Sequence, residues 1–180
     1  MLGVILLILL TAFSSLVRAQ IYRYGFIIGT VTIWKTNYYV SQLSDIDSSA
    51  DKGTHGNFTA QQYGPDLTND TLTEENTGGG STNYEADLEV QWTNVDFDET
   101  NEELCIYGGV MGSESLRVDV WNGSSWQNII ASLNSGWNNV TVSAYLVSST
   151  ITIRFNGSIE TADGTQDNWA IDTTLLHVWT

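Results

Sequence analysis

The sequence predicts a mainly β protein, an antiparallel β-sandwich of jelly-roll type, preceded by a long apolar N-terminal α-helix. From Tyr84 onward, short segments alternate apolar and polar residues and are separated by turn formers. At the other end of the chain, Met1 to Val17 is an apolar run without a charged side chain. We therefore expect an apolar N-terminal helix at residues 1–35, which serves as an oligomerisation or membrane segment, and an acidic β-sandwich domain at residues 36–180.

The apolar run lacks the polar stripe that a helix on the surface of a globular domain shows. As a helix with a rise of about 1.5 Å per residue it would be roughly 25 Å long, and it would need lipid or other apolar helices as partners. The residues that we expect to form the assembly core of such a helix bundle are Leu2, Val4, Ile5, Leu6, Leu7, Ile8, Leu9, Leu10, Phe13, Leu16 and Val17.

Three interpretations of this run compete. A secretory signal peptide would have its apolar core at Leu2 to Phe13 and be cleaved after Ala19. A membrane anchor is less favoured, because the run is short for a span and basic residues come only after it. We favour the N-terminal helix of a pilin-like subunit, because no Lys or Arg precedes Leu2, as expected once a basic leader has been removed.

The segment after Val17 is ambiguous. Ile21, Tyr24, Ile28 and Val31 continue a helical spacing, whereas Gly25, Gly29 and the β-branched TVTI sequence weaken a helix. We expect the helix to reach about Ile28 or beyond, although residues 30–40 could equally form the first strand. The following polar stretch, residues 41–83, should be mostly loop, with short strands near residues 57–61 and 70–74.

The remaining chain predicts the strands of the sandwich. Leu88, Val90 and Trp92 alternate with polar neighbours, and so do Ile151 and Ile153. Strands with one apolar and one polar face are what two packed sheets require. The tryptophans within or beside these strands are expected to pack in the core; they are Trp92, Trp121, Trp126, Trp137, Trp169 and Trp179.

Composition limits the classes of partner. The chain has 21 acidic residues against 6 basic ones and a net charge of −15, and no acid precedes Asp45. Such a body repels nucleic-acid phosphates, and it is typical of an extracellular or saline setting. Cys105 is the only cysteine, so no intrachain disulfide exists, and a buried apolar role is expected for it.

Several stretches carry a resemblance to a known group of proteins. They include SDIDSSADKGTHGNFTAQQYGPD, NYEADLEVQWTNVDFDETNEELCIY and WNNVTVSAYLVSSTITIRFNGSIETADGTQDNWAIDTTLLHVW. From about Tyr38 to Thr180, the chain resembles a domain that recurs in predicted surface and secreted proteins of archaea. The apolar N-terminal segment resembles archaeal type IV pilin-like subunits in general character. The resemblance implies a cell-surface β-sandwich of archaeal origin, and it transfers no catalytic residues.

Two sets of polar residues are candidate sites. Acidic residues near both ends of the body could converge to supply the oxygen ligands that calcium prefers, although turn-forming and solvated aspartates are the more common reading; they are Asp45, Asp47, Asp51, Asp163, Asp167 and Asp172. Five Asn-x-Ser/Thr sequons could carry N-linked glycans after export, at Asn57, Asn69, Asn122, Asn139 and Asn156.

Catalysis is not expected. His55 and His177 are the only histidines, and no nucleophile motif, phosphate-binding loop or HExxH motif is present. We predict instead a structural subunit of an extracellular, cell-surface filament, with the N-terminal helices bundled in its core and the sandwiches outside, for adhesion or surface attachment. Its partners would be copies of itself, and the membrane before assembly.

Two alternatives remain open. One is a secreted carbohydrate-binding module, cleaved after Ala19, that recognises a saccharide through exposed Trp or Tyr, with or without calcium. The other is a filament in which residues 20–34 insert as a strand into the next subunit.

Overall fold

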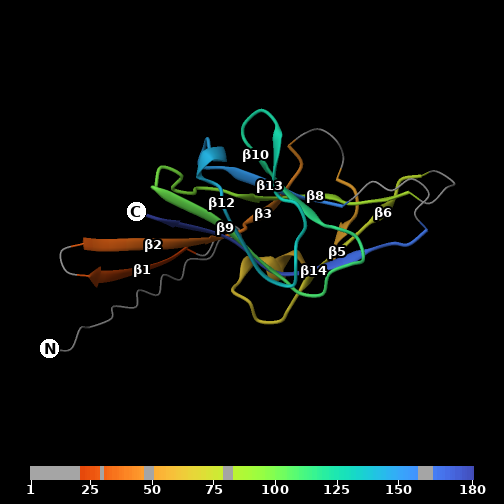
Figure 1. Cartoon of the computed structure of the whole chain (residues 1–180), viewed down its shortest axis with the longest axis horizontal. Coiled ribbons are helices and arrows are strands. Elements are labelled where there is room, and N and C mark those ends of the chain that lie inside the picture. Colours follow the sequence, from red (N-terminus) through yellow and green to blue (C-terminus); the bar gives the residue numbers. More distant parts are fainter. Residues whose placement is uncertain (1–20, 29–30, 47–50, 79–82, 158–163) are drawn as a thin grey trace, which may run out of the picture.

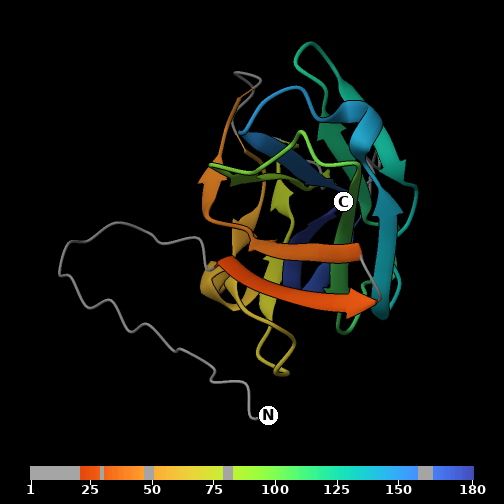
Figure 2. The ribbon, with the colours of Figure 1, turned by 90° about the vertical axis from the view of Figure 1, so that its left-hand side faces the viewer.

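Two antiparallel sheets packed face to face form the body of the protein (Figures 1 and 2). The computed structural model describes residues 21–28, 31–46, 51–78, 83–157 and 164–180, and side chains only from residue 35 onward. The predicted antiparallel β-sandwich is confirmed.

The larger sheet has seven strands arranged around β14, which is the longest strand of the described chain. On one side β14 pairs with β9, which pairs in turn with β12. On the other side the N-terminal half of β14 pairs with β5, and its C-terminal half pairs with β2. The strands are β1 (Ile21–Ile28), β2 (Val31–Tyr39), β4 (Thr54–His55), β5 (Asp70–Thr73), β9 (Asn101–Gly108), β12 (Gly136–Thr141) and β14 (Asn168–Trp179).

The second sheet has five strands in the order β11-β10-β13-β8-β3. Their bounds are Trp126–Ile130 (β11), Arg117–Trp121 (β10), Ile151–Asn156 (β13), Asp87–Trp92 (β8) and Gln42–Ser44 (β3). A two-stranded ribbon, β6 (Glu75–Asn76) with β7 (Tyr84–Glu85), and two 3-10 helices, η1 (Phe58–Gln62) and η2 (Ser143–Tyr145), complete the described elements. The predicted strand near residues 70–74 is present as β5, whereas residues 58–62 form η1 instead of a strand.

The strand pairs are nested. β10 pairs with β11, β9 with β12, β8 with β13 and β5 with β14, so that each pair encloses the one before it along the chain. The chain from β5 to β14 therefore folds like one long hairpin that is rolled into two layers. This nesting explains why β9 and β14, far apart in sequence, are neighbours in the larger sheet.

The core lies between the two sheets and is built from the inward positions of both. Inward residues alternate with outward ones, as in β9, where Leu104 and Ile106 are buried in the core. Each fully buried aliphatic or aromatic side chain stabilises the fold by roughly 1.5–3 kcal/mol. Trp92 and Trp169 are completely covered, and each indole N–H donates to a backbone carbonyl, of Tyr38 at 2.9 Å and of Glu114 at 3.1 Å. The core role expected for the tryptophans is correct for these two and wrong for Trp137, which is 49% exposed. The other three, Trp121, Trp126 and Trp179, are half-buried.

The helix predicted for residues 1–35 is wrong wherever the structure describes this segment. Residues 21–28 and 31–39 are two strands of one hairpin, paired from Ile21 with Tyr38 to Ile28 with Val31. Gly25 disfavours a helix, and the β-branched Val31, Thr32 and Ile33 favour extended backbone. The expected assembly core, Leu2 to Val17, lies outside the described residues. Among the described residues no helix has the length and apolar character needed to cross a bilayer.

Candidate functional sites on the seven-stranded sheet

The first candidate site is the tip of the β1–β2 hairpin. The last pair between β14 and β2 joins Trp179 to Lys35, and, among the described residues, residues 31–34 of β2 pair only with β1. We call residues 25–28 and 31–34 the arm. In Figure 1 the hairpin (red to orange) runs past the end of the sandwich marked C.

The arm is apolar, and in the described structure its backbone pairs with no strand of the sandwich beyond the hairpin itself. Its sequences, GFII and VTIW, contain no charged residue. A two-stranded ribbon alone is marginally stable in water at best, and an open strand edge is a template for further pairing. Within the described structure β1 pairs with β2 alone, so its other edge is open. The arm therefore has the composition and the open edge of a segment that binds another polypeptide.

The second candidate site is a hollow of about 390 Å³ on the outer face of the same sheet. We call it the aromatic cleft. Outward positions of four strands line it, joined by a proline of the loop after η1; the lining residues are Asn37, Tyr39, Pro65, Cys105, Trp137, Asn139, Leu175 and His177. Because Leu104, Ile106, Leu176 and Val178 occupy the core positions of β9 and β14, Cys105, Leu175 and His177 face outward.

Aromatic rings and amide groups shape the cleft. Trp137 is 49% exposed, and its ring meets that of Tyr107 edge to face, with centroids 5.3 Å apart. His177 is held by a hydrogen bond between its Nδ1 and Oδ1 of Asn37, at 2.6 Å. With Asn37 Oδ1 as acceptor, Nδ1 of His177 carries the proton, and the neutral ring keeps Nε2 as an acceptor.

No lining residue of the cleft is charged at neutral pH. Burial, and then the positive charge of Lys35, lower the pKa of His177 below its usual 6.5, against the opposing effect of Glu103, so the ring is neutral at pH 7. Burial, and then Glu103, raise the pKa of the Cys105 thiol to about 12. The thiol is therefore protonated and not nucleophilic, in line with the apolar role expected for Cys105.

The acidic residues predicted to bind calcium do not form one cluster among the described residues. Asp47 and Asp163 lie outside the described residues. Asp51 lies in the loop beside the five-stranded sheet, where burial and then the charges of Asp45 and Asp87 raise its pKa to about 6. The described residues contain no group of three or more acidic, His or Cys side chains positioned to hold a metal ion. Calcium binding stays a prediction.

The C-terminal aspartates of that set hold turns of the chain. Asp172 is buried and accepts hydrogen bonds from the backbone N–H groups of Asp66 and Leu67, at 3.2 and 2.9 Å. Asp167 accepts hydrogen bonds from the backbone N–H groups of Ser113 and Glu114, both at 3.0 Å. These carboxylates satisfy loop backbone groups, which is the turn-forming role expected for aspartate.

The five sequons lie at the surface to different degrees. Asn57, Asn69 and Asn139 are exposed, whereas Asn122 and Asn156 are half-buried. Asn122 accepts from the backbone N–H groups of Ser124 and Ser125, and Asn156 accepts from Arg117. Asn139 differs from the others because its side chain lines the aromatic cleft, two residues after Trp137 on the same strand. Glycosylation stays a prediction for all five.

One histidine is part of a buried polar network. His55 Nδ1 lies 2.6 Å from Asp70 Oδ2, and Asp70 also accepts from the Asn57 N–H at 2.8 Å and from Gln61 Nε2 at 2.8 Å. Burial would raise the pKa of Asp70, but these hydrogen bonds outweigh it and lower the pKa. Gln61 in turn accepts from Thr174 Oγ1 at 2.6 Å. The network ties η1 to β14.

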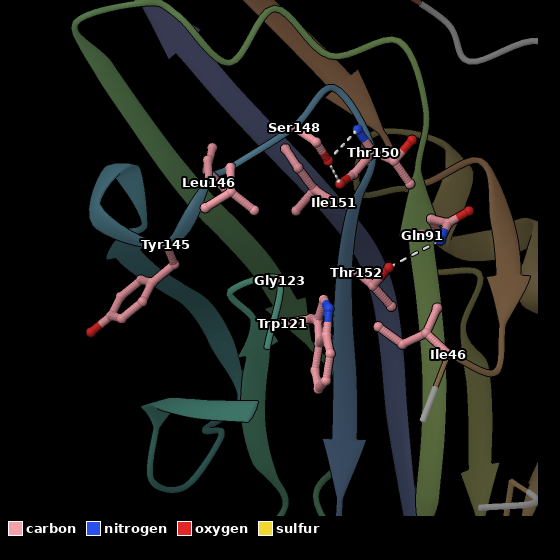
Figure 3. A pocket seen from close by; sticks show the side chains of 11 residues that line it. Ile46, Gln91, Trp121, Gly123, Tyr145, Leu146, Ser148, Thr150, Ile151 and Thr152 are labelled. Carbon is pink, nitrogen blue, oxygen red and sulfur yellow. Dashed lines mark hydrogen bonds between the residues drawn. The ribbon is translucent and has the colours of Figure 1, made fainter. Parts of the chain in front are cut away.

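The five-stranded sheet has a groove of its own, of about 240 Å³, at one end of its outer face (Figure 3). Ile46, Trp121 and Leu146 are among its apolar lining residues. Polar side chains in its wall are paired with each other: Gln91 Nε2 donates to Thr152 Oγ1 at 3.0 Å (Figure 3).

The sequence did not single out the aromatic cleft. Its residues come from β2, β9, β12 and β14, which no local pattern joins. One signal was present: Trp137 and Asn139, like Leu175 and His177, stand two residues apart on one face of a predicted strand. Comparison with protein-family models, with curated proteins and with solved structures finds no match to this chain.

Proposed function

We propose that this protein is an exported subunit of an extracellular cell-surface filament, in which the arm of one copy pairs with the sheet of the next. The observation that supports this is the apolar arm, which extends past the last residue pair of β14 with β2 and whose β1 edge is open among the described strands. Burying its Phe, Ile, Val and Trp side chains against a neighbour would contribute roughly 1.5–3 kcal/mol each.

The strand character of residues 21–28 and 31–39 favours strand pairing over a bundle of helices for this part of the assembly. The described strands of the larger sheet at the C-terminal half of β14 run in the order β12-β9-β14-β2-β1, so β1 and β12 are opposite edges of one sheet. An arm edge that binds the β12 edge of the next copy joins unlike surfaces, and repetition of such a contact gives an open filament. The acidic bodies, with their jelly-roll nesting of strands, form the outside and serve attachment.

The test compares the full chain with two variants in which a lysine replaces an apolar residue. Phe26→Lys places a charge in the arm, whereas Val110→Lys places one on a residue that is already 78% exposed elsewhere. Negative-stain microscopy and sedimentation should show filaments for the wild type and Val110→Lys, and soluble monomers for Phe26→Lys. Filaments formed equally by all three proteins, or monomers in all three, would contradict the proposal.

N-terminal sequencing of the same filaments separates the two modes of assembly. Filaments whose subunits begin at Gln20 support strand pairing through residues 20–34. Filaments whose subunits retain residues 2–17 and survive Phe26→Lys would instead support a bundle of N-terminal helices.

A further inference from the structure

We propose that the aromatic cleft is a binding site for a neutral saccharide. This inference does not depend on filament formation, because it rests on the outer face of the seven-stranded sheet and on none of the arm residues. The cleft combines a concave shape, an exposed indole and planar amides, which together suit a sugar ring.

The exposed ring of Trp137 is the first feature of the cleft that suits a sugar. Trp92 and Trp169 are completely buried, whereas Trp137 is 49% exposed at the rim of a hollow. Its only ring contact among the described residues is edge to face with Tyr107, at 5.3 Å between centroids. A large aromatic surface left open beside a cavity marks a place where a ligand buries apolar area. The C–H face of a pyranose is such an area, and it is flat enough to lie against an indole.

The hydrogen-bonding groups of the cleft are the second feature that suits a sugar. Sugar hydroxyls need both donors and acceptors of hydrogen bonds, and the cleft offers the amide of Asn139 and the imidazole of His177. The hydrogen bond from His177 to Asn37, at 2.6 Å, fixes the imidazole before a ligand arrives, which lowers the entropic cost of binding. Leu175 and Cys105 add apolar surface to the lining of the cleft.

Charge selects a neutral saccharide over an acidic one. The cleft has no ionised lining residue at pH 7, since the pKa of His177 is lowered and that of Cys105 is raised to about 12. The chain carries a net charge of −15, so its overall field opposes the approach of a uronate or another anionic sugar. A neutral hexose or N-acetylhexosamine meets no such barrier.

The saccharide has two possible sources, which share this chemistry. One is a glycan on another molecule. The other is a glycan attached to Asn139 itself, because this sequon residue lines the cleft and a sugar linked to it would start beside Trp137. A tethered sugar acts at a high effective concentration, so it would occupy the cleft and exclude a second one.

The first experiment uses the full chain, produced in a host without N-glycosylation. Tryptophan fluorescence and calorimetric titrations are made with hexaoses of glucose, of mannose and of N-acetylglucosamine, and with a galacturonate hexamer as the anionic probe. We expect at least one neutral hexaose to bind, and the galacturonate to bind at least tenfold more weakly. Trp137→Ala should weaken binding at least tenfold, whereas Trp121→Ala, the matched change on the other sheet, should leave it within twofold.

The second experiment distinguishes the sources. The same titrations are made with protein from a glycosylating host, after intact mass has shown that Asn139 is modified. Thr141→Ala removes the sequon and keeps Asn139 in the cleft. Binding that is lost in the glycosylated chain and regained in Thr141→Ala assigns the cleft to the chain's own glycan, and binding that is unchanged assigns it to a saccharide from another molecule. The proposal is overturned if none of the neutral hexaoses binds, or if Trp121→Ala weakens binding as much as Trp137→Ala.

Discussion

The outer faces of the two sheets both present aromatic rings, but they use them differently. On the five-stranded sheet the guanidinium of Arg154 lies 4.7 Å from the centroid of the Trp126 ring. Its Nε donates to Asp119 Oδ2 at 2.9 Å, and its Nη1 lies 3.3 Å from Asp87 Oδ2. On the seven-stranded sheet Trp137 is half exposed beside a hollow, and no cation covers it among the described residues. Trp126 is therefore covered by a cation that also binds two carboxylates, whereas Trp137 is open beside the aromatic cleft.

The largest effect that follows from this comparison is on stability. Arg154→Ala should lower the free energy of unfolding by about 2–4 kcal/mol, because it leaves Asp119, whose side chain is 6% exposed, and Asp87 without their shared cation and uncovers Trp126. Urea unfolding followed by circular dichroism measures this loss. Arg117→Ala, which removes an exposed side chain bonded to Asn156, is the control and should change stability by less than about 1 kcal/mol. Equal effects of the two changes would show that Arg154 does not organise this face.

The sequence predicted the sandwich because its information is local. Alternation in segments such as Leu88 to Trp92 sets which side chains enter the core, whatever the neighbouring strand. The helix was mispredicted at residues 21–35 because apolar composition alone does not separate a helix from a strand, and the deciding residues were Gly25 and the β-branched Val31 to Ile33.

The sites were less predictable for a physical reason. The cleft exists only after β2, β9, β12 and β14 have paired, and their registers depend on contacts between distant parts of the chain. The predicted calcium set shows the same limit. Asp167 and Asp172 were candidate calcium ligands, with turn formation as the more common role, and each is bonded to backbone N–H groups of a separate loop. Counting acidic residues cannot show which of them a turn already uses.

The second prediction concerns Trp137 on the seven-stranded sheet. Trp137→Ala should lower the free energy of unfolding by about 1 kcal/mol or less, because half of the side chain is already in water and its ring contact is with Tyr107 alone among described residues. Thermal and urea unfolding of the purified variant provide the measurement. A loss of stability as large as that of Arg154→Ala would mean that Trp137 is a structural residue. That result would contradict its role as a ligand-binding ring in the aromatic cleft.

The smallest effect is a pH dependence on the five-stranded side. Burial, and then the negative charges of Asp45 and Asp87, raise the pKa of Asp51 from 3.8 to about 6. A carboxyl group that holds its proton more tightly in the folded state favours folding at low pH, and this contribution is lost as the pH rises from about 3.8 to about 6. Above that range the ionised Asp51 is a cost to the folded state. Asp51→Asn should therefore raise Tm by about 2 °C at pH 7.5, with the size reduced by partial exposure, and leave Tm unchanged near pH 3.5.

Added salt and added calcium should each change the Tm effect of Asp51. Salt at 1 M should shrink the Tm difference at pH 7.5, since it screens the repulsion from Asp45 and Asp87 but leaves the effect of burial. Calcium should raise the Tm of the wild type and not of Asp51→Asn if Asp51 supplies a ligand, because a cation would turn the mutual repulsion of these carboxylates into shared attraction. A wild-type Tm that does not respond to calcium would remove Asp51 from the predicted metal set. A Tm difference between wild type and Asp51→Asn that is equally large at pH 3.5 would show that the carboxylate charge is not the cause.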